Sequence, residues 1–450
     1  MTRRNPWIAT GLPMFFGLFV AYLDRSALST GLPELSRSLH FSGASFAVIS
    51  SLLLTLFNAG YGVANVIGGF AANRMNPKWV VTAAMALWCI ADILTGLSTT
   101  VTLVIIFRVL LGIAEGVYWP QQSRIAVAWF SRDQLSRANS VIQFYGQFLS
   151  LGIGFLILAS LNGALGWRWM FLLVGLAGIV VVLPMFLFLL HGSPDEIMAG
   201  ATRAERRALA RTRAGQRAAE RQAAREAAKN RERISLASFG GPRFVLVIIA
   251  YFTQGMVFWG ITLWIPLAVS ALGFGGNLAG FLSGVPYLCG IAFAIPLTII
   301  SDRTGKRVPI ASGGLLASGI ALLLLLAVHG SVGQIVLISI AVGVLYGSFS
   351  PNIWSIIQAT VTPDAVGPAS GIVNGIGAGL GGVVAGWLVG LLLAATRSYT
   401  PGFILLGAAA VIGSASLIAY GRRVARTRGR APGQTPDSGL PQASPSDAGV

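Results

Sequence analysis

The segment TIISDRTGKR (298–307) and the segment GFAANRMNPK (69–78) decide the fold. Each lies between two long apolar runs, at the same place in its half of the chain. Both combine basic residues with residues that favour turns, and short loops rich in Lys and Arg stay on the cytoplasmic side of a membrane. A loop that returns at the same place in two halves indicates that the halves are repeats of one another.

The rest of the sequence consists largely of apolar runs. The chain has 450 residues, of which 54% are hydrophobic and 10% charged, too few polar residues to cover a soluble fold. Runs long enough to cross a hydrocarbon core of about 30 Å with about 20 residues lie near 7–31, 46–72, 78–98, 101–123, 138–161, 167–190, 243–271, 277–300, 308–328, 332–358, 366–394 and 400–420. We therefore predict an all-α membrane protein of twelve transmembrane helices in two pseudo-symmetric six-helix bundles.

The loops divide the chain into four parts. These are an N-terminal bundle (1–190), a cytoplasmic Arg-rich linker (191–241), a C-terminal bundle (242–421) and a disordered cytoplasmic tail (422–450). Basic residues gather in alternate loops, so we expect a multi-pass protein of the bacterial inner membrane with both termini in the cytoplasm. The net charge of +17 reflects this topology, and no nucleic-acid partner is expected.

Charged residues inside the apolar runs point to function, because an ionised group at the bilayer centre costs roughly 2.5 to 3.5 kcal/mol. Asp24 and Arg25 lie in the first run, and Arg108 and Glu115 lie in the fourth. Arg108 and Glu115 are seven residues apart, which places them on nearly the same helical face. We predict a cluster whose acids bind and release protons. Salt bridges that only hold the first and fourth helices together are the alternative.

Asp92 is a further acid inside an apolar run. It lies near the outer end of the third predicted helix, where a charged side chain can snorkel to the lipid headgroups. We therefore leave it out of the predicted site.

Four segments, in order along the chain, resemble the anion:cation symporter family of the major facilitator superfamily. They are YLDRSALS (22–29), RVLLGIAEGVYWPQQSRIAVAWF (108–130), GWRWMF (166–171) and SGIVNGIGAGLGG (370–382). This family includes sugar-acid, hexuronate, aromatic-carboxylate and sialin-like transporters. The resemblance implies that Asp24 and Glu115 couple transport to protons. It makes Arg108 their charge partner and Arg25 the residue that holds the substrate carboxylate.

The resemblance also implies further residues. The implied substrate contacts are Tyr22, Tyr61, Gln147, Trp264, Trp354 and Asn374. For the two tryptophans, packing or a place at the membrane interface is an equal alternative. The loop at 298–307 resembles the superfamily's loop motif in Asp302, Arg303, Gly305 and Arg307. The loop at 69–78 departs from the motif, with Asn73 in place of the acid and Asn76 in place of the glycine.

These features predict a secondary active transporter that takes up a small organic anion, such as a sugar acid or an aromatic carboxylate, together with protons. An antiporter or exporter of metabolites or drugs is the first alternative, but such proteins usually carry a Gly-Pro motif in the fifth helix, and YGQFLSLGIGFLILASL (145–161) has no proline. A transporter-like ligand sensor is the second alternative.

Catalysis is not expected. The sequence has no nucleotide-binding loop, metal-ligand cluster or nucleophile with a base partner. We expect no cofactor and no metal, with protons as the coupling ion. The expected partners are the anion and membrane lipid, and the resemblance implies a monomer.

Overall fold

The computed structural model describes residues 5–41, 44–71, 76–130, 142, 145–191, 239, 241–361 and 366–428. These residues form helices joined by short turns, with no β-strand among them. Eleven helical stretches in this part of the chain are long and apolar enough to cross a membrane. The protein is thus an all-α, multi-pass membrane protein, as the sequence predicts.

The first half begins with a π-helical segment, η1, which leads directly into α1. Its elements are η1 (Trp7–Gly11), α1 (Leu12–Ser38), α2 (Ala44–Ala71), α3 (Pro77–Gly96), α4 (Val101–Trp129), α6 (Gly146–Ala177), η4 (Gly178–Val182) and η5 (Met185–Leu189). The second half contains η8 (Gly241–Arg243), α9 (Phe244–Ala271), α10 (Gly276–Thr304), α11 (Arg307–Leu323), η9 (Leu324–Leu326), α12 (Ser331–Thr360), α13 (Val366–Asn374), η11 (Gly375–Leu380), α14 (Gly381–Thr396) and α15 (Thr400–Arg428).

One apolar stretch makes two crossings. Gly146–Leu189 runs for 44 residues, which as one straight helix would extend about 66 Å, twice the hydrocarbon core. The backbone breaks at Gly166, where φ is 83° and ψ is 164°. The two limbs correspond to the predicted runs 138–161 and 167–190, and with them the twelve predicted transmembrane segments are accounted for.

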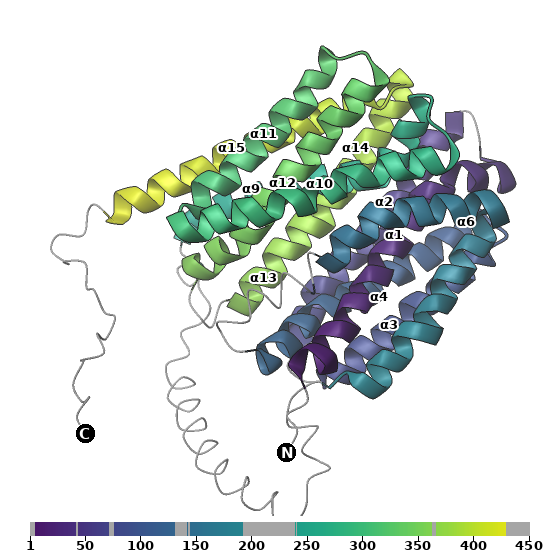
Figure 1. The fold of residues 1–450 in the computed structure, drawn as a ribbon, viewed down its shortest axis with the longest axis horizontal. Coiled ribbons are helices and arrows are strands. Elements are labelled where there is room, and N and C mark those ends of the chain that lie inside the picture. Colours follow the sequence, from purple (N-terminus) through teal and green to yellow (C-terminus); the bar gives the residue numbers. More distant parts are fainter. Residues whose placement is uncertain are drawn as a thin grey trace, which may run out of the picture.

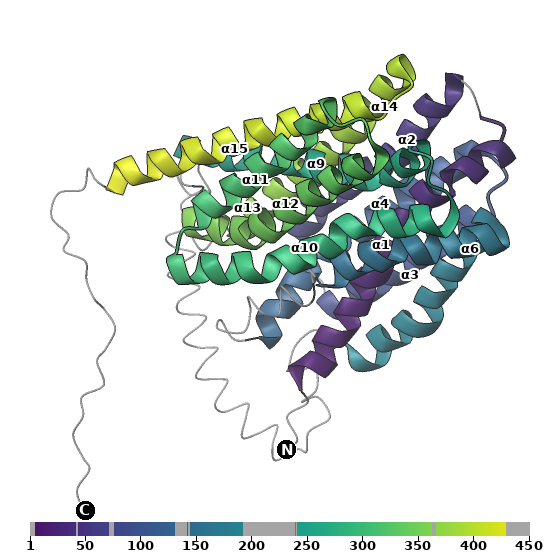
Figure 2. The same cartoon turned by 45° about the horizontal axis from the view of Figure 1, so that its top comes forward.

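The two halves form separate bundles that lie side by side (Figures 1 and 2). In the first half α2 packs on α4, and α1 packs on α6. In the second half α10 packs on α12, and α11 packs on α15. Contacts between the halves include those of α2 with α13, η11 and α14, of α6 with α10, and of α1 with α9. The predicted architecture of two bundles is confirmed.

One end of the bundles, which we call the Gly166 end, carries the turns at His40, Gly166, Gly273 and Arg397, each with positive φ. The halves meet closely on this side. The Ser51 hydroxyl donates a hydrogen bond to the Gly386 carbonyl at 3.1 Å. A Cβ atom placed on Gly284 would lie only 1.9 Å from the carbonyl oxygen of Gly152. The contact between α6 and α10 therefore depends on a glycine at position 284.

The last helix is longer than predicted. Helix α15 continues to Arg428, so the first residues assigned to the disordered tail (422–450) are helical. This correction has a local cause, because residues 422–428 include neither Gly nor Pro, and Gly429 and Pro432 are the first helix breakers. Residues 192–238, Asn73 and 429–450, which include most of the predicted linker and tail, lie outside the described residues.

Candidate functional site

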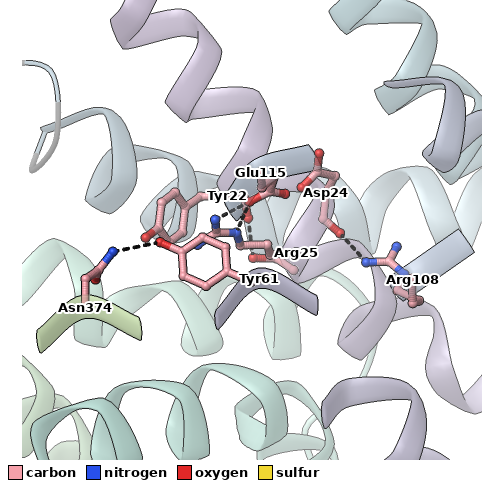
Figure 3. A network of polar contacts seen from close by, with 8 residues as sticks. Tyr22, Asp24, Arg25, Tyr61, Arg108, Glu115 and Asn374 are labelled. Carbon is pink, nitrogen blue, oxygen red and sulfur yellow. Dashed lines mark hydrogen bonds and ion pairs between the residues drawn. The ribbon is translucent and has the colours of Figure 1, made fainter. Parts of the chain in front are cut away.

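Arg25 on α1 forms an ion pair with Glu115 on α4, deep inside the first half (Figure 3). The Nε–H group of Arg25 donates to Oε2 of Glu115 at 2.5 Å, and Nη2 contacts the same oxygen. The two residues are 3% and 1% exposed. A buried pair is stable only while both partners are present, so removing either charge leaves the other exposed to an apolar interior.

Aromatic rings surround the Arg25 guanidinium. Its central carbon lies 4.3 Å from the ring centroid of Tyr22 and 5.1 Å from those of Phe57, Tyr61 and Trp259. Aromatic ring faces attract cations, so these rings help to hold the guanidinium in the interior. Trp259 belongs to α9 of the second half, and therefore Arg25 lies where the two bundles meet.

Tyr61 makes a second link between the halves. The Asn374 side-chain amide, at the end of α13, donates to the Tyr61 hydroxyl at 3.4 Å (Figure 3). The structure thus brings Tyr22, Tyr61 and Asn374 close to Arg25.

Arg108 on α4 pairs with an acid that we did not place in the site. Its Nη2 lies 3.4 Å from Oδ1 of Asp92 on α3, and its Nη1 donates to the backbone carbonyl of Asp24 at 3.4 Å. Asp92 is 1% exposed. The expectation that Asp92 snorkels toward the membrane surface is wrong, because its side chain points into the bundle toward Arg108.

Asp24 completes a group of five charged residues that we call the charged cluster: Asp24, Arg25, Asp92, Arg108 and Glu115. Asp24 is 0% exposed, and neither carboxylate oxygen has a hydrogen-bond partner among the described residues. The charged groups that act on it are Asp92, Glu115, Arg108 and Arg25. The structure therefore brings the four predicted charged residues together and adds Asp92.

The other predicted contact residues are more scattered. Trp264 is buried near the Gly166 end, with its ring centroid 6.0 Å from that of Tyr399. Trp354 packs edge-on against Tyr251 at 5.7 Å, and Gln147 is half-buried on α6. For Trp264 this position matches the packing alternative.

The second loop motif forms a tight helix-to-helix turn. Gly305 ends α10 with φ of 64°, and Arg303 and Arg307 are exposed on either side of it. The Arg307 N–H donates to the Gly305 carbonyl at 3.0 Å. The side chain of Asp302 lies outside the described residues. In the first copy, Asn76 caps α3 by accepting a hydrogen bond from the Lys78 N–H at 2.9 Å.

Sequence reasoning missed Asp92, Phe57 and Trp259. Phe57 stands four residues before Tyr61 on α2, a spacing that places both rings on one face and could have revealed it. Nothing in the local sequence separates Trp259 from a lipid-facing tryptophan.

A charged cluster buried in one six-helix bundle, with Arg25 also facing Trp259 of the other bundle, is the arrangement of a membrane carrier, in which such residues mark the path of a solute or ion. The Major Facilitator Superfamily profile matches residues 14–386 and 273–443. The chain therefore belongs to the Major Facilitator Superfamily.

Similar sequences include transporters of several kinds. The probable galactarate/D-glucarate transporter GarP of Escherichia coli (strain K12) is 24% identical over 80% of this chain and 82% of its own length. The hexuronate transporter of Bacillus subtilis (strain 168) is 24% identical over 92% of this chain and 95% of its own. A quinolone resistance transporter of Acinetobacter baumannii is 23% identical over 64% of this chain and 65% of its own.

Two solved structures share the fold. The partially occluded, inward-open xylose transporter XylE of E. coli has a TM-score of 0.71, 15% identity, and coverage of 92% of this chain and 99% of its own. A bacterial homologue of the human lysosomal transporter Spinster has a TM-score of 0.66, 16% identity, and coverage of 92% and 96%. These proteins are transporters and not enzymes, in agreement with the sequence prediction.

Proposed function

We propose that this protein is a secondary active transporter of the bacterial inner membrane that takes up a small organic anion together with protons. The Arg25–Glu115 ion pair carries the proposal. It places a guanidinium that can bind a carboxylate beside an acid that can bind a proton, at the junction of the two bundles.

The ion pair suggests how the two events are coupled. A substrate carboxylate that binds Arg25 has to displace Glu115, because the two compete for the same guanidinium. Glu115 is then buried without its partner, because the Arg25 guanidinium holds the substrate carboxylate. Binding of a proton neutralises the Glu115 carboxylate. Release of the anion on the other side lets Glu115 lose that proton and pair with Arg25 again. The substrate and the proton therefore cross together as the bundles rock.

The relatives support the class of substrate. Those named for galactarate, D-glucarate and hexuronate act on sugar acids, which carry carboxylates. The rings of Tyr22, Tyr61 and Trp259 offer flat faces that suit either a sugar ring or an aromatic acid. We place both termini in the cytoplasm on the basis of the basic loops, and propose a monomer that needs no cofactor beyond protons.

Export is the second candidate, favoured by the relative named for quinolone resistance. In that case inward proton flow would drive the solute outward. The ion pair between Arg25 and Glu115 favours an anion over the bulky zwitterionic or cationic solutes of many exporters.

Uptake into liposomes tests the proposal. The reconstituted protein would be offered D-glucarate, D-glucuronate, benzoate and D-xylose, with and without an inward proton gradient. We expect at least one of the acids to accumulate when the gradient is present. Accumulation of the neutral sugar alone would contradict the proposal of an anion substrate, and gradient-driven loss of solute from loaded liposomes would support export.

Variants assign the roles. We expect Glu115→Gln to abolish proton-driven accumulation while retaining counterflow exchange, and Arg25→Ala to abolish binding itself. Arg37→Ala is the matched control, because Arg37 lies on the same helix but is exposed at the Gly166 end. If Glu115→Gln accumulates the acid normally under the gradient, the coupling role of Glu115 is wrong.

A further inference from the structure

We propose that the charged cluster holds a resident proton on Asp24 even without substrate, because Asp92 occupies the guanidinium that Asp24 would otherwise use. Asp92 is then a positioning residue that decides which acid carries the proton. The inference deepens the proposed function, since its role in transport depends on proton coupling, but the proton itself can be detected without transport.

The first step is the balance of charge. The cluster contains three carboxylates and two guanidinium groups, and all five residues are at most 3% exposed. Arg25 pairs with Glu115, and Arg108 pairs with Asp92. If every group were ionised, the cluster would carry one excess negative charge. That charge would fall on Asp24, the acid without an ion-pair partner.

The second step is the surroundings of Asp24. Its own helix contributes Arg25, α3 contributes Asp92 and the buried thiol of Cys89, and α4 contributes Arg108 and Glu115. From α6, the ring of Phe171 packs against the Arg108 guanidinium at 5.0 Å. The groups named on these helices provide two positive charges, and both are in ion pairs with other acids. A buried carboxylate in this position is far more stable when protonated.

The third step is where the proton can go. Asp92 and Glu115 are the acids that act on Asp24, and each of the three carboxyl groups has at least one oxygen without a hydrogen-bond partner among the described residues. Two carboxylates cannot hydrogen-bond to one another unless one of them carries a proton, because an ionised carboxylate only accepts. A proton on Asp24 supplies this donor. It satisfies an oxygen that otherwise has no partner and removes the excess charge in one step.

The fourth step concerns Arg108. Its Nη1 already donates to the Asp24 backbone carbonyl while its Nη2 contacts Asp92, so the guanidinium lies between the two acids. If the proton moves from Asp24 to Asp92, Arg108 can pair with the Asp24 carboxylate instead. The proton leaves one carboxyl oxygen and binds to another, so the charge of the cluster is unchanged. In this exchange the proton moves from Asp24 to Asp92, and the ion pair with Arg108 moves from Asp92 to Asp24.

Infrared spectroscopy of the full-length protein in lipid at pH 7, with no substrate present, tests this inference. A protonated carboxyl group absorbs in the C=O stretching region of carboxylic acids, apart from ionised carboxylates, and the band shifts in D₂O. We expect the unmodified protein to show this band and Asp24→Asn to lack it. We also expect Asp92→Asn to lose it, because Arg108 is then free to pair with an ionised Asp24.

Glu34→Gln is the matched control. Glu34 accepts a hydrogen bond from the Trp167 N–H at 3.2 Å near the Gly166 end, away from the charged cluster, so the band should remain. A native elution profile in size-exclusion chromatography identifies variants that fold. Absence of the band in the unmodified protein at pH 7 overturns the inference, and so does a band that survives in folded Asp92→Asn.

The same measurement separates this inference from the proposed function. Proton-driven uptake by a protein that shows no carboxylic acid band would leave the proposed function in place and reject the resident proton. A band with the expected response to Asp24→Asn and Asp92→Asn, in a protein that shows no proton-driven uptake, would support the resident proton and reject symport.

Discussion

Replacing Gly284 by alanine is expected to open the Gly166 end of the transporter. The added Cβ would lie 1.9 Å from the Gly152 carbonyl oxygen, whereas real Cβ contacts below 3.0 Å essentially never occur. Helices α6 and α10 must therefore move apart by at least about 1.1 Å, and the contacting atom is backbone, which cannot rotate away. Such overpacking costs about 1 to 3 kcal/mol.

We expect that cost to fall on conformations in which α6 and α10 stay in contact at Gly152 and Gly284, and to be relieved where the two helices separate. A bias of about 1 to 3 kcal/mol corresponds to a shift of about 5- to 150-fold in a two-state equilibrium. We therefore expect the conformation with this end open to gain population by that factor. Gly163→Ala is the matched control, because Gly163 lies on α6 near the same end, and a Cβ there meets nothing within 4 Å.

Cysteine labelling measures the shift. Ser51 is 2% exposed and lies between α2 and α14 at the Gly166 end, so Ser51→Cys reports opening there. The assay uses a chain in which Cys89 and Cys289 are replaced by alanine, and a membrane-impermeant maleimide. We expect faster labelling with Gly284→Ala than with Gly163→Ala. Equal labelling rates in the two backgrounds would refute the reasoning.

Three smaller changes test other contacts. Asn76→Ala should lower thermal stability by about 0.5 to 2 kcal/mol through loss of the α3 cap, and Asn76→Asp should restore most of it, as measured by thermal unfolding in detergent. Gly305→Ala should cost about 1 to 2 kcal/mol in the same assay, because φ there is 64°. Trp259→Ala should weaken binding of the transported acid by about 0.5 to 2 kcal/mol, measured by calorimetry, because one ring face beside Arg25 is lost; unchanged affinity would mean that the ring only packs.

The sequence predicts the architecture well because a membrane constrains it strongly. A helix that crosses about 30 Å of hydrocarbon needs about 20 apolar residues, so the number and order of helices follow from the apolar runs alone. The residues at which the helices end are predicted less accurately from the apolar runs. Helix α15 ends at Arg428, about two turns beyond the end of the predicted run 400–420. Charged residues beyond the hydrocarbon core are compatible with a helix that continues into water.

The charged cluster was only partly predictable. Asp24, Arg25, Arg108 and Glu115 stand out because charges inside apolar runs are costly. Sequence position gives the depth of a residue in the membrane but not the neighbour that faces it from another helix. Arg108 was therefore expected to pair with acids on α1 and α4, whereas its guanidinium contacts Asp92 on α3.

The break at Gly166 has a consequence for how the protein is made. The backbone there has φ of 83°, which L side chains rarely adopt, and Glu34 of α1 accepts a hydrogen bond from the next residue, Trp167, at 3.2 Å. The two limbs of this stretch are joined at Gly166 without a loop, so we expect them to insert together. They should leave the translocon as a single helical hairpin, after α1 is already in place to receive the corner. A side chain at position 166 would thus first disturb biogenesis, at the moment when the hairpin has to fold.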